Sequence, residues 1–142
     1  MMMQKRLFLT IAAAAMAFGI SGAHAGAPSA IAGAITVDAD TVITMLTEQS
    51  GTHLIDSRKT SDYDAGHIEG AVMITNDAMT EDNLIEVIGS HDAPVIFYCN
   101  GASCGRAADA AEKAVSWGFT KVHYYYGGVE DWKSLELPLI SN

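Results

Sequence analysis

An apolar run at residues 95–98 is followed directly by a cysteine, a loop of small residues and an alanine-rich segment at 107–115. Consecutive β-branched and aromatic residues predict a buried strand, and the alanine-rich segment has high helix propensity. Cys99 is therefore expected where a strand ends, in a loop that leads into a helix. Backbone N–H groups and the positive end of a helix favour a thiolate or a bound anion at such a place.

The rest of the chain alternates strand-like and helix-like segments. This alternation predicts an α/β fold with a mostly parallel sheet that is covered by helices on both faces. Ligands of such sheets bind beyond the carboxyl ends of the strands, where Cys99 lies. Strands are predicted at 34–37, 53–56, 71–74, 94–98 and 121–125, and helices at 41–49, 80–88, 105–117 and 129–135, with one helical turn capped near Thr60 or Ser61.

The first 25 residues have the pattern of a secretory signal peptide. Lys5 and Arg6 precede an apolar run at 7–20, and an A-x-A motif ends at Ala25, after which cleavage is expected. A transmembrane anchor is the alternative, but the apolar run is shorter than the roughly 20 residues that span a bilayer. We expect a periplasmic protein that does not associate with the membrane once residues 1–25 are removed.

The mature chain is predicted to consist of a flexible, small-residue segment at 26–33 and one domain at 34–142. Without Lys5 and Arg6 it has 6 basic residues against 17 acidic ones, a net charge of −11. Such a charge disfavours nucleic acids and anionic membrane surfaces as partners.

Both cysteines of the chain, Cys99 and Cys104, lie in the same loop. Outside the cytoplasm a close pair is often oxidised. Three roles for Cys104 remain open: a resolving thiol that attacks an adduct on Cys99, a partner in a reversible disulfide with Cys99, or a residue without a role. Two cysteines without a second ligand pair do not make a zinc site, so we expect no metal and no cofactor.

Three separated blocks make the sequence resemble the rhodanese family of sulfurtransferases. The first comprises residues 54–58, Tyr63 and 66–71, the second is the cysteine loop, and the third comprises residues 127–132 with the Leu-Pro pair at 137–138. The resemblance implies a three-layer α/β fold with a parallel five-stranded sheet. It also implies that Cys99 is the catalytic nucleophile, which accepts a sulfane sulfur as a persulfide and passes it to a thiol.

The resemblance assigns substrate binding to the loop that follows Cys99. Its glycines permit a close approach of the backbone to a ligand, and the guanidinium of its arginine suits an anionic donor. That arginine lies two residues farther from the cysteine than in the usual family loop. The predicted substrate-binding residues are Asn100, Gly101, Ala102, Ser103, Cys104, Gly105 and Arg106.

Asp56 and Arg58 are predicted to support the loop structurally, and His67 to form structural hydrogen bonds. The leading hypothesis is a sulfurtransferase that moves sulfur from a small sulfur-containing anion, resembling thiosulfate or polysulfide, to a thiol acceptor. The alternatives are a thiol–disulfide or sulfur-carrier module that uses Cys99 and Cys104 with an exported partner protein, and a non-catalytic binding domain. A phosphatase fits the loop length less well.

Overall fold

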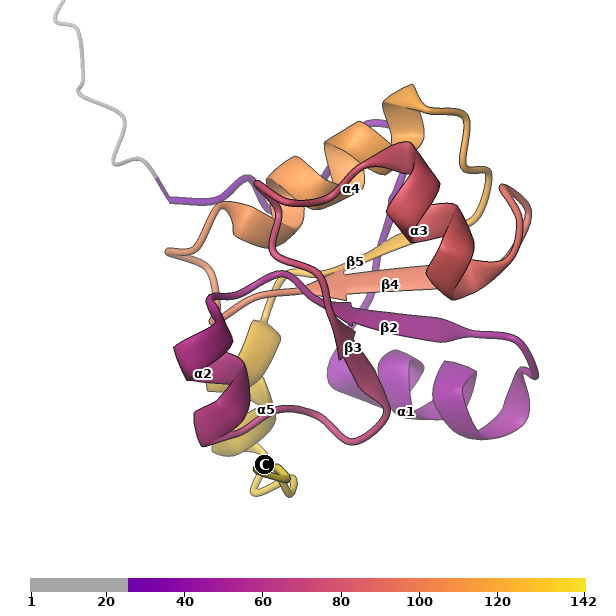
Figure 1. The fold of residues 1–142 in the computed structure, drawn as a ribbon. Coiled ribbons are helices and arrows are strands. Elements are labelled where there is room, and N and C mark those ends of the chain that lie inside the picture. Colours follow the sequence, from indigo (N-terminus) through magenta and orange to yellow (C-terminus); the bar gives the residue numbers. More distant parts are fainter. Residues whose placement is uncertain (1–25) are drawn as a thin grey trace, which may run out of the picture.

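Five parallel strands form one sheet in the computed structural model, which describes residues 26–142 (Figure 1). The order β1-β5-β4-β2-β3 places β4 in the centre, and all paired strands run parallel. The predicted parallel five-stranded α/β fold is therefore confirmed. The predicted signal peptide lies outside the described residues. The strands are β1 (Ile35–Thr36), β2 (His53–Asp56), β3 (Ala71–Met73), β4 (Val95–Tyr98) and β5 (Val122–Tyr125).

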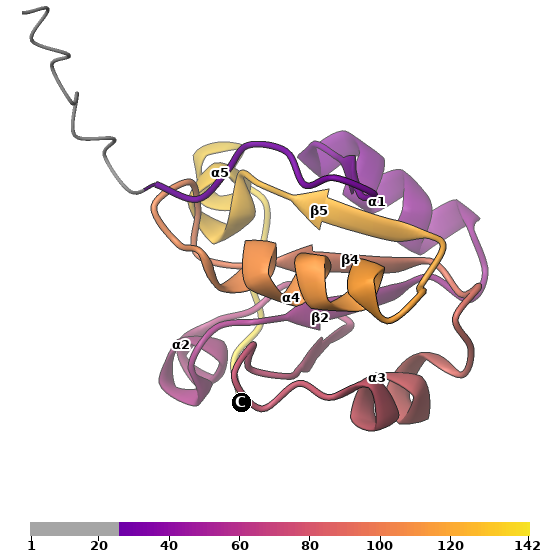
Figure 2. The same cartoon turned by 90° about the horizontal axis from the view of Figure 1, so that it is seen from above.

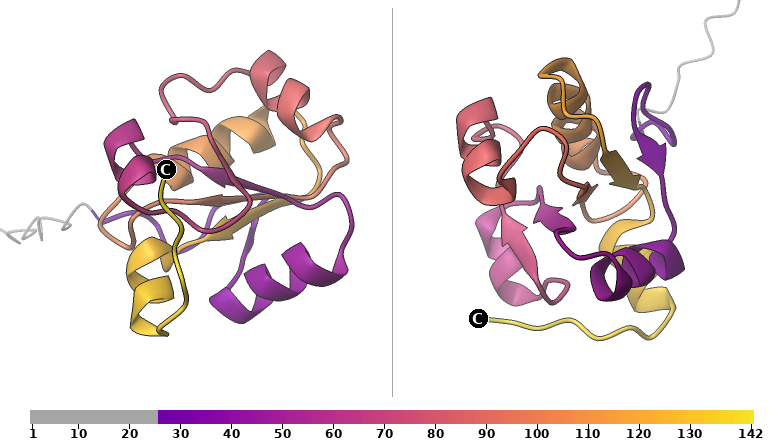
Figure 3. Two further views of the ribbon diagram at one scale, coloured as in Figure 1. Left: turned by 60° about the horizontal axis from the view of Figure 1, so that its bottom comes forward. Right: turned by 90° about the vertical axis from the view of Figure 1, so that its right-hand side faces the viewer.

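Helices cover both faces of the sheet. α3 and α4 lie on one face and α1 and α5 on the other, while α2 stands at the carboxyl edge of the strands (Figures 1 and 2). The two further views show the same layers, with α4 and α5 on opposite sides of the sheet (Figure 3). The helices are α1 (Ala39–Glu48), α2 (Thr60–Ala65), α3 (Glu81–Ile88), α4 (Arg106–Ser116) and α5 (Gly128–Ser134).

Local capping explains where two of the helices begin. The Asp38 side chain accepts a hydrogen bond from the Thr41 amide at 2.8 Å, so α1 starts two residues earlier than predicted. Thr80 and Asn83 form a reciprocal capping box at the start of α3, which confirms the predicted cap at Thr80. The predicted cap of α2 is wrong, because the N-cap is Lys59 and no side chain caps that helix.

Alternate residues of the strands supply two separate cores. On the α3 and α4 side, Ile55 and Phe97 pack against the alanine face of α4. On the α1 and α5 side, Leu54, Ile96 and Tyr98 pack against Val42 and Trp132, among others. Every residue of β4 is buried, and burying each large apolar side chain stabilises the fold by about 1.5–3 kcal/mol. The central strand and the residue that follows it are thereby held firmly in place.

The segment 26–33 packs along the domain. Ile31 is 5% exposed and belongs to the α3 and α4 core, and the Tyr124 hydroxyl donates to the Pro28 carbonyl at 3.0 Å. Ile31 thus supplies an apolar anchor for this segment, whose flexibility stays a prediction. Within residues 26–142, no helix is long and apolar enough to cross a membrane.

Candidate active site

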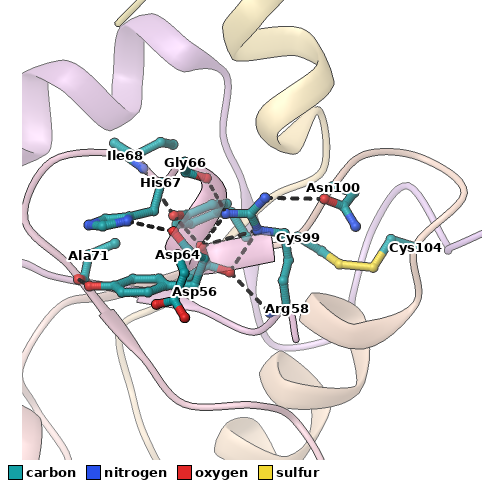
Figure 4. A network of polar contacts seen from close by, with 12 residues as sticks. Asp56, Arg58, Asp64, Gly66, His67, Ile68, Ala71, Cys99, Asn100 and Cys104 are labelled. Atoms are coloured by element: carbon teal, nitrogen blue, oxygen red, sulfur yellow. Dashed lines mark hydrogen bonds and ion pairs between the residues drawn. A yellow bond between two sulfur atoms is a disulfide. The ribbon is translucent and has the colours of Figure 1, made fainter. Parts of the chain in front are cut away.

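Cys99 directly follows β4, at the carboxyl edge of the sheet, and forms a disulfide with Cys104 (Figure 4). The two Cα atoms are 6.2 Å apart, within the usual span of a disulfide. Cys99 is 3% exposed, whereas Cys104 is partly exposed. Of the three roles left open for Cys104, the structure shows that of disulfide partner to Cys99.

The start of α5 holds the beginning of the cysteine loop. The Val129 amide donates to the Cys99 carbonyl at 3.0 Å, and the Glu130 amide donates to the Asn100 carbonyl at 2.8 Å. Gly128 has φ +59°, and a Cβ at this position would lie 2.9 Å from backbone atoms of Asn100 and Gly101. A glycine is thus required at position 128, where α5 approaches the loop.

The middle of the loop turns back on itself and touches an acidic side chain. The Cys104 amide donates to the Gly101 carbonyl at 3.0 Å, so this amide is used within the loop. A Cβ at Gly101 would lie 2.8 Å from the carboxyl carbon of Glu130, so this carboxylate lies directly against the loop. Its negative charge opposes the approach of anions from that side.

The other predicted substrate-binding residues lie at or near the surface. Ala102 and Ser103 are exposed, and the Ala102 carbonyl accepts from the Ala27 amide at 2.8 Å. Gly105 is exposed and forms the N-cap of α4 without a side-chain capping bond. The exposed tip of the loop is therefore open to a ligand or partner, while its base is fixed by α5.

A buried ion pair lies beside the loop. Arg58 donates from Nε and Nη2 to both carboxylate oxygens of Asp56 at 2.8–3.1 Å, and neither residue is more than 3% exposed. Arg58 also donates to the Asn100 side-chain oxygen at 3.3 Å and to the Gly66 carbonyl at 2.7 Å. Arg58 therefore links the cysteine loop to the segment after α2 (Figure 4).

Tyr98 completes this buried network. Its hydroxyl donates to Asp56 at 2.6 Å and accepts from the Ile68 amide at 3.2 Å. Burial, together with the neighbouring Asp56 charge, raises the pKa of Tyr98 far above its ordinary value. Burial alone would lower the pKa of Arg58, but hydrogen bonds and charge from Asp56 outweigh it and raise that pKa. Tyr98 thus remains neutral and Arg58 charged at neutral pH.

His67 makes structural contacts. Its Nδ1 lies 2.8 Å from the Tyr63 carbonyl oxygen, and the two rings stack with centroids 3.7 Å apart. The Tyr63 hydroxyl donates to the Ala71 carbonyl at 2.9 Å. His67 is buried, and its backbone pairs with Ile140 in an isolated bridge. These contacts agree with the structural role expected for His67.

Arg106 is bound elsewhere, although it was predicted to face an anion at Cys99. Its Nη1 donates to the Asn76 side-chain oxygen at 2.8 Å and lies 3.7 Å from the Asp77 carboxylate. Both partners belong to the loop after β3, whose position no local sequence pattern predicts. In this arrangement the Arg106 charge is partly balanced before any donor binds.

Ser57 is a site residue that the sequence reasoning missed. Its amide donates to the Tyr98 carbonyl at 3.0 Å, which extends the pairing of β2 with β4 and places Ser57 beside Cys99. Cys99 packs in the core on the α4 side, and the alternation of side chains along a strand predicts the same side for Ser57. Ser57 is fully buried, and its hydroxyl has no hydrogen-bond partner among the described residues. Only the strand register reveals this neighbour.

A pocket of about 350 Å³ lies next to the base of the loop. Arg58, Asn100 and Glu130 line it together with Asp62 and Lys133, so its charges are mixed. Cys99 is not among the lining residues. Within residues 26–142, no group of three or more His, Cys, Asp or Glu side chains is arranged to hold a metal ion.

Residues 38–135 match the family model of the rhodanese-like domain. The thiosulfate sulfurtransferase GlpE of Vibrio cholerae is 32% identical over 93 residues, which cover 65% of this chain and 82% of that protein. The HTH-type transcriptional regulator Rv0324 of Mycobacterium tuberculosis is 37% identical over 86 residues, which cover 61% of this chain. The matched part is only 36% of Rv0324, and it is 66% of the Escherichia coli protein YibN.

Solved structures show the same fold. The BH2092 protein of Bacillus halodurans superposes with a TM-score of 0.67 at 28% identity, over 76% of this chain and 77% of that one. The five-stranded parallel sheet and its covering helices are thus shared with known structures.

Proposed function

The chain belongs to the rhodanese-like domain family, and we propose that it is a sulfurtransferase whose Cys99 carries sulfur as a persulfide. The observation that supports this most strongly is the position of Cys99. It lies directly after the carboxyl end of the central strand, at the start of the loop that leads into the N-terminus of α4. A thiolate is favoured at such a helix end, and the thiolate is the reactive form of cysteine. The similarity to a thiosulfate sulfurtransferase supports the same chemistry.

The reaction begins from the reduced cysteine pair. The Cys99 thiolate attacks the sulfane sulfur of the donor, a new S–S bond forms at Sγ, and the rest of the donor leaves with the electron pair. An acceptor thiolate then attacks the outer sulfur of the persulfide, and Cys99 leaves as a thiolate. The exposed loop tip at Ala102 and Ser103 is the side from which both substrates approach.

Charges around the loop favour a polysulfide-like donor over thiosulfate. Arg106 is bound to Asn76, Arg58 is paired with Asp56, and the Glu130 carboxylate lies against the loop. Thiosulfate has sulfonate oxygens that need hydrogen-bond donors, so one of these arginines would have to be released to hold it, whereas a polysulfide has no oxygens to be held.

Export of the protein is part of the proposal. The predicted signal peptide at residues 1–25 supports a periplasmic location, where an exported partner protein is a further candidate acceptor. A periplasmic location also agrees with a disulfide between Cys99 and Cys104.

A sulfur-transfer assay tests the proposal. Reduced mature chain, residues 26–142, is mixed with polysulfide and a small thiol, and the thiol persulfide formed is measured. We expect turnover by the wild type and background rates with Cys99→Ser, whose unfolding curve shows whether it is folded. A folded Cys99→Ser variant that retains wild-type turnover would refute the role of Cys99.

Thiol–disulfide exchange is a second candidate, favoured by the bridge itself. In that case the pair cycles between disulfide and dithiol with an exported partner, and no sulfur atom is carried. Cys104→Ala distinguishes the two functions, because it abolishes disulfide cycling whereas persulfide formation requires only Cys99. A reduced Cys99 that does not react with iodoacetamide at neutral pH would instead favour the non-catalytic binding domain.

A further inference from the structure

The disulfide changes which sulfur compounds can react at the loop. In the bridged state Cys99 has no thiolate, so it cannot attack a sulfane donor. The bridge is instead an electrophile, which a thiolate or hydrosulfide attacks at one sulfur while the other sulfur leaves. The observed state is therefore suited to a reduced sulfur nucleophile as its substrate.

The surroundings of the bridge favour a small nucleophile of low charge. The Glu130 carboxylate lies against Gly101 of the same loop, and Arg106 is bound to Asn76. The mature chain also carries a net charge of −11. These charges repel hydrosulfide less than a dianion, because hydrosulfide carries a single charge and is in equilibrium with neutral hydrogen sulfide.

The two sulfurs of the bridge are not equivalent. Cys99 is 3% exposed, buried by the α4 face of the core, whereas Cys104 is partly exposed near the loop tip. An incoming nucleophile therefore reaches Cys104 more easily. The sulfur that leaves is that of Cys99, which starts the loop leading into the N-terminus of α4, where a thiolate is favoured. In backbone register it neighbours Ser57, whose buried hydroxyl has no hydrogen-bond partner among residues 26–142.

We propose that the bridged protein takes sulfur from hydrosulfide, using its own disulfide as the oxidant. Hydrosulfide attacks Cys104 Sγ, the bond between the two sulfurs breaks, and Cys99 leaves as a thiolate with the electron pair. Cys99 then attacks the outer sulfur on Cys104, which leaves Cys104 as a thiolate and Cys99 as the persulfide. The sulfide is oxidised by two electrons, and the disulfide is reduced by two.

This inference rests on the proposed function, because its product is the same Cys99 persulfide. After the sulfur has passed to an acceptor thiol, the cysteine pair is a dithiol. Each further round requires an external disulfide oxidant to form the bridge again. The bridged and reduced proteins thus accept different donors, hydrosulfide in the first state and polysulfide in the second.

Intact mass spectrometry of the mature wild-type chain in both redox states tests the inference. Bridged protein treated with sodium sulfide is expected to gain one sulfur and two hydrogen atoms, with the added sulfur on Cys99 after alkylation and fragmentation. Reduced protein in the same sulfide solution is expected to gain nothing, because no oxidant is present. This arm also controls for polysulfide contamination.

Reduced protein treated with polysulfide separates the two claims. If it gains sulfur at Cys99 but the bridged protein gains none from sulfide, the inference is wrong and the proposed function stands. If the reduced protein gains sulfur from sulfide as readily as the bridged protein does, the bridge is not the oxidant and the inference is also wrong. Failure of the polysulfide arm refutes the proposed function itself.

Discussion

Cys99 and its neighbours decide the chemistry at the scale of single residues. The strand pattern alone placed Cys99 at a strand end, because four consecutive apolar residues precede it. The contacts of Arg106 could not be predicted in this way, since its partner Asn76 lies 30 positions away in a loop without regular structure. Ser57 was missed for a similar reason, because only the pairing of β2 with β4 brings it beside Cys99.

Replacing Ser57 with alanine tests whether its hydroxyl stabilises the Cys99 thiolate. A hydrogen bond to a charged group contributes about 1.5–3 kcal/mol, so we expect reduced Ser57→Ala to react with iodoacetamide at neutral pH roughly tenfold more slowly. Ser116→Ala, which removes a hydroxyl at the end of α4, is the matched control and should leave the rate unchanged. Equal rates for Ser57→Ala and the wild type would exclude this role.

At the scale of elements, the start of α5 and the cysteine loop form one unit. Two helix amides donate to loop carbonyls, and Gly128 permits the close approach. The sequence predicted α5 to within one residue at each end, since its apolar residues and flanking glycine and proline mark it clearly. It did not predict that this helix holds the loop, because contacts between distant segments leave no periodic pattern.

Gly128→Ala should displace the loop. A left-handed conformation costs an alanine about 1–2 kcal/mol, and its Cβ would also collide with the backbone of Asn100 and Gly101. We expect lower stability to denaturant and slower alkylation of reduced Cys99. Gly51→Ala is the matched control, with φ +83° and nothing within 4 Å of the added Cβ. The Gly51→Ala variant should be less stable to denaturant, but its reduced Cys99 should be alkylated at the wild-type rate. An equal loss of Cys99 reactivity in both variants would contradict the account.

The Asp56–Arg58 pair connects three elements around the site. The sequence suggested that both residues support the loop, and the structure places Arg58 against the Asn100 side chain. The reach of the network to Tyr98 and Gly66 was not predicted, because it depends on how the chain after α2 folds back over β4. Breaking a buried pair of this kind costs about 3–5 kcal/mol, so the pair contributes to fold stability as well.

At the scale of the whole molecule, one sheet is covered on both faces by helices. The alternation of segments was sufficient to predict the parallel architecture, because a sheet that is apolar on both faces must be covered on both. The packing of residues 26–33 was not predictable from their composition. A single isoleucine among small residues anchors this segment in the α3 and α4 core.

Ile31→Ala should destabilise the entire domain. Removing this buried side chain is expected to lower the free energy of unfolding by about 2–3 kcal/mol, measured by urea denaturation of the mature chain. Ile35→Ala is the matched control, because Ile35 is 61% exposed, and it should change stability by less than about 0.5 kcal/mol. Equal effects of the two substitutions would show that the segment does not anchor the fold.

The central claim is that Cys99 carries sulfur, and intact mass spectrometry tests it most directly. Mature chain is reduced, treated with polysulfide, freed of excess donor, alkylated and fragmented. The account predicts one added sulfur atom on Cys99 in the wild type and none in folded Cys99→Ser. A folded wild-type chain with free thiols that gains no sulfur, or gains it only on Cys104, would contradict the account.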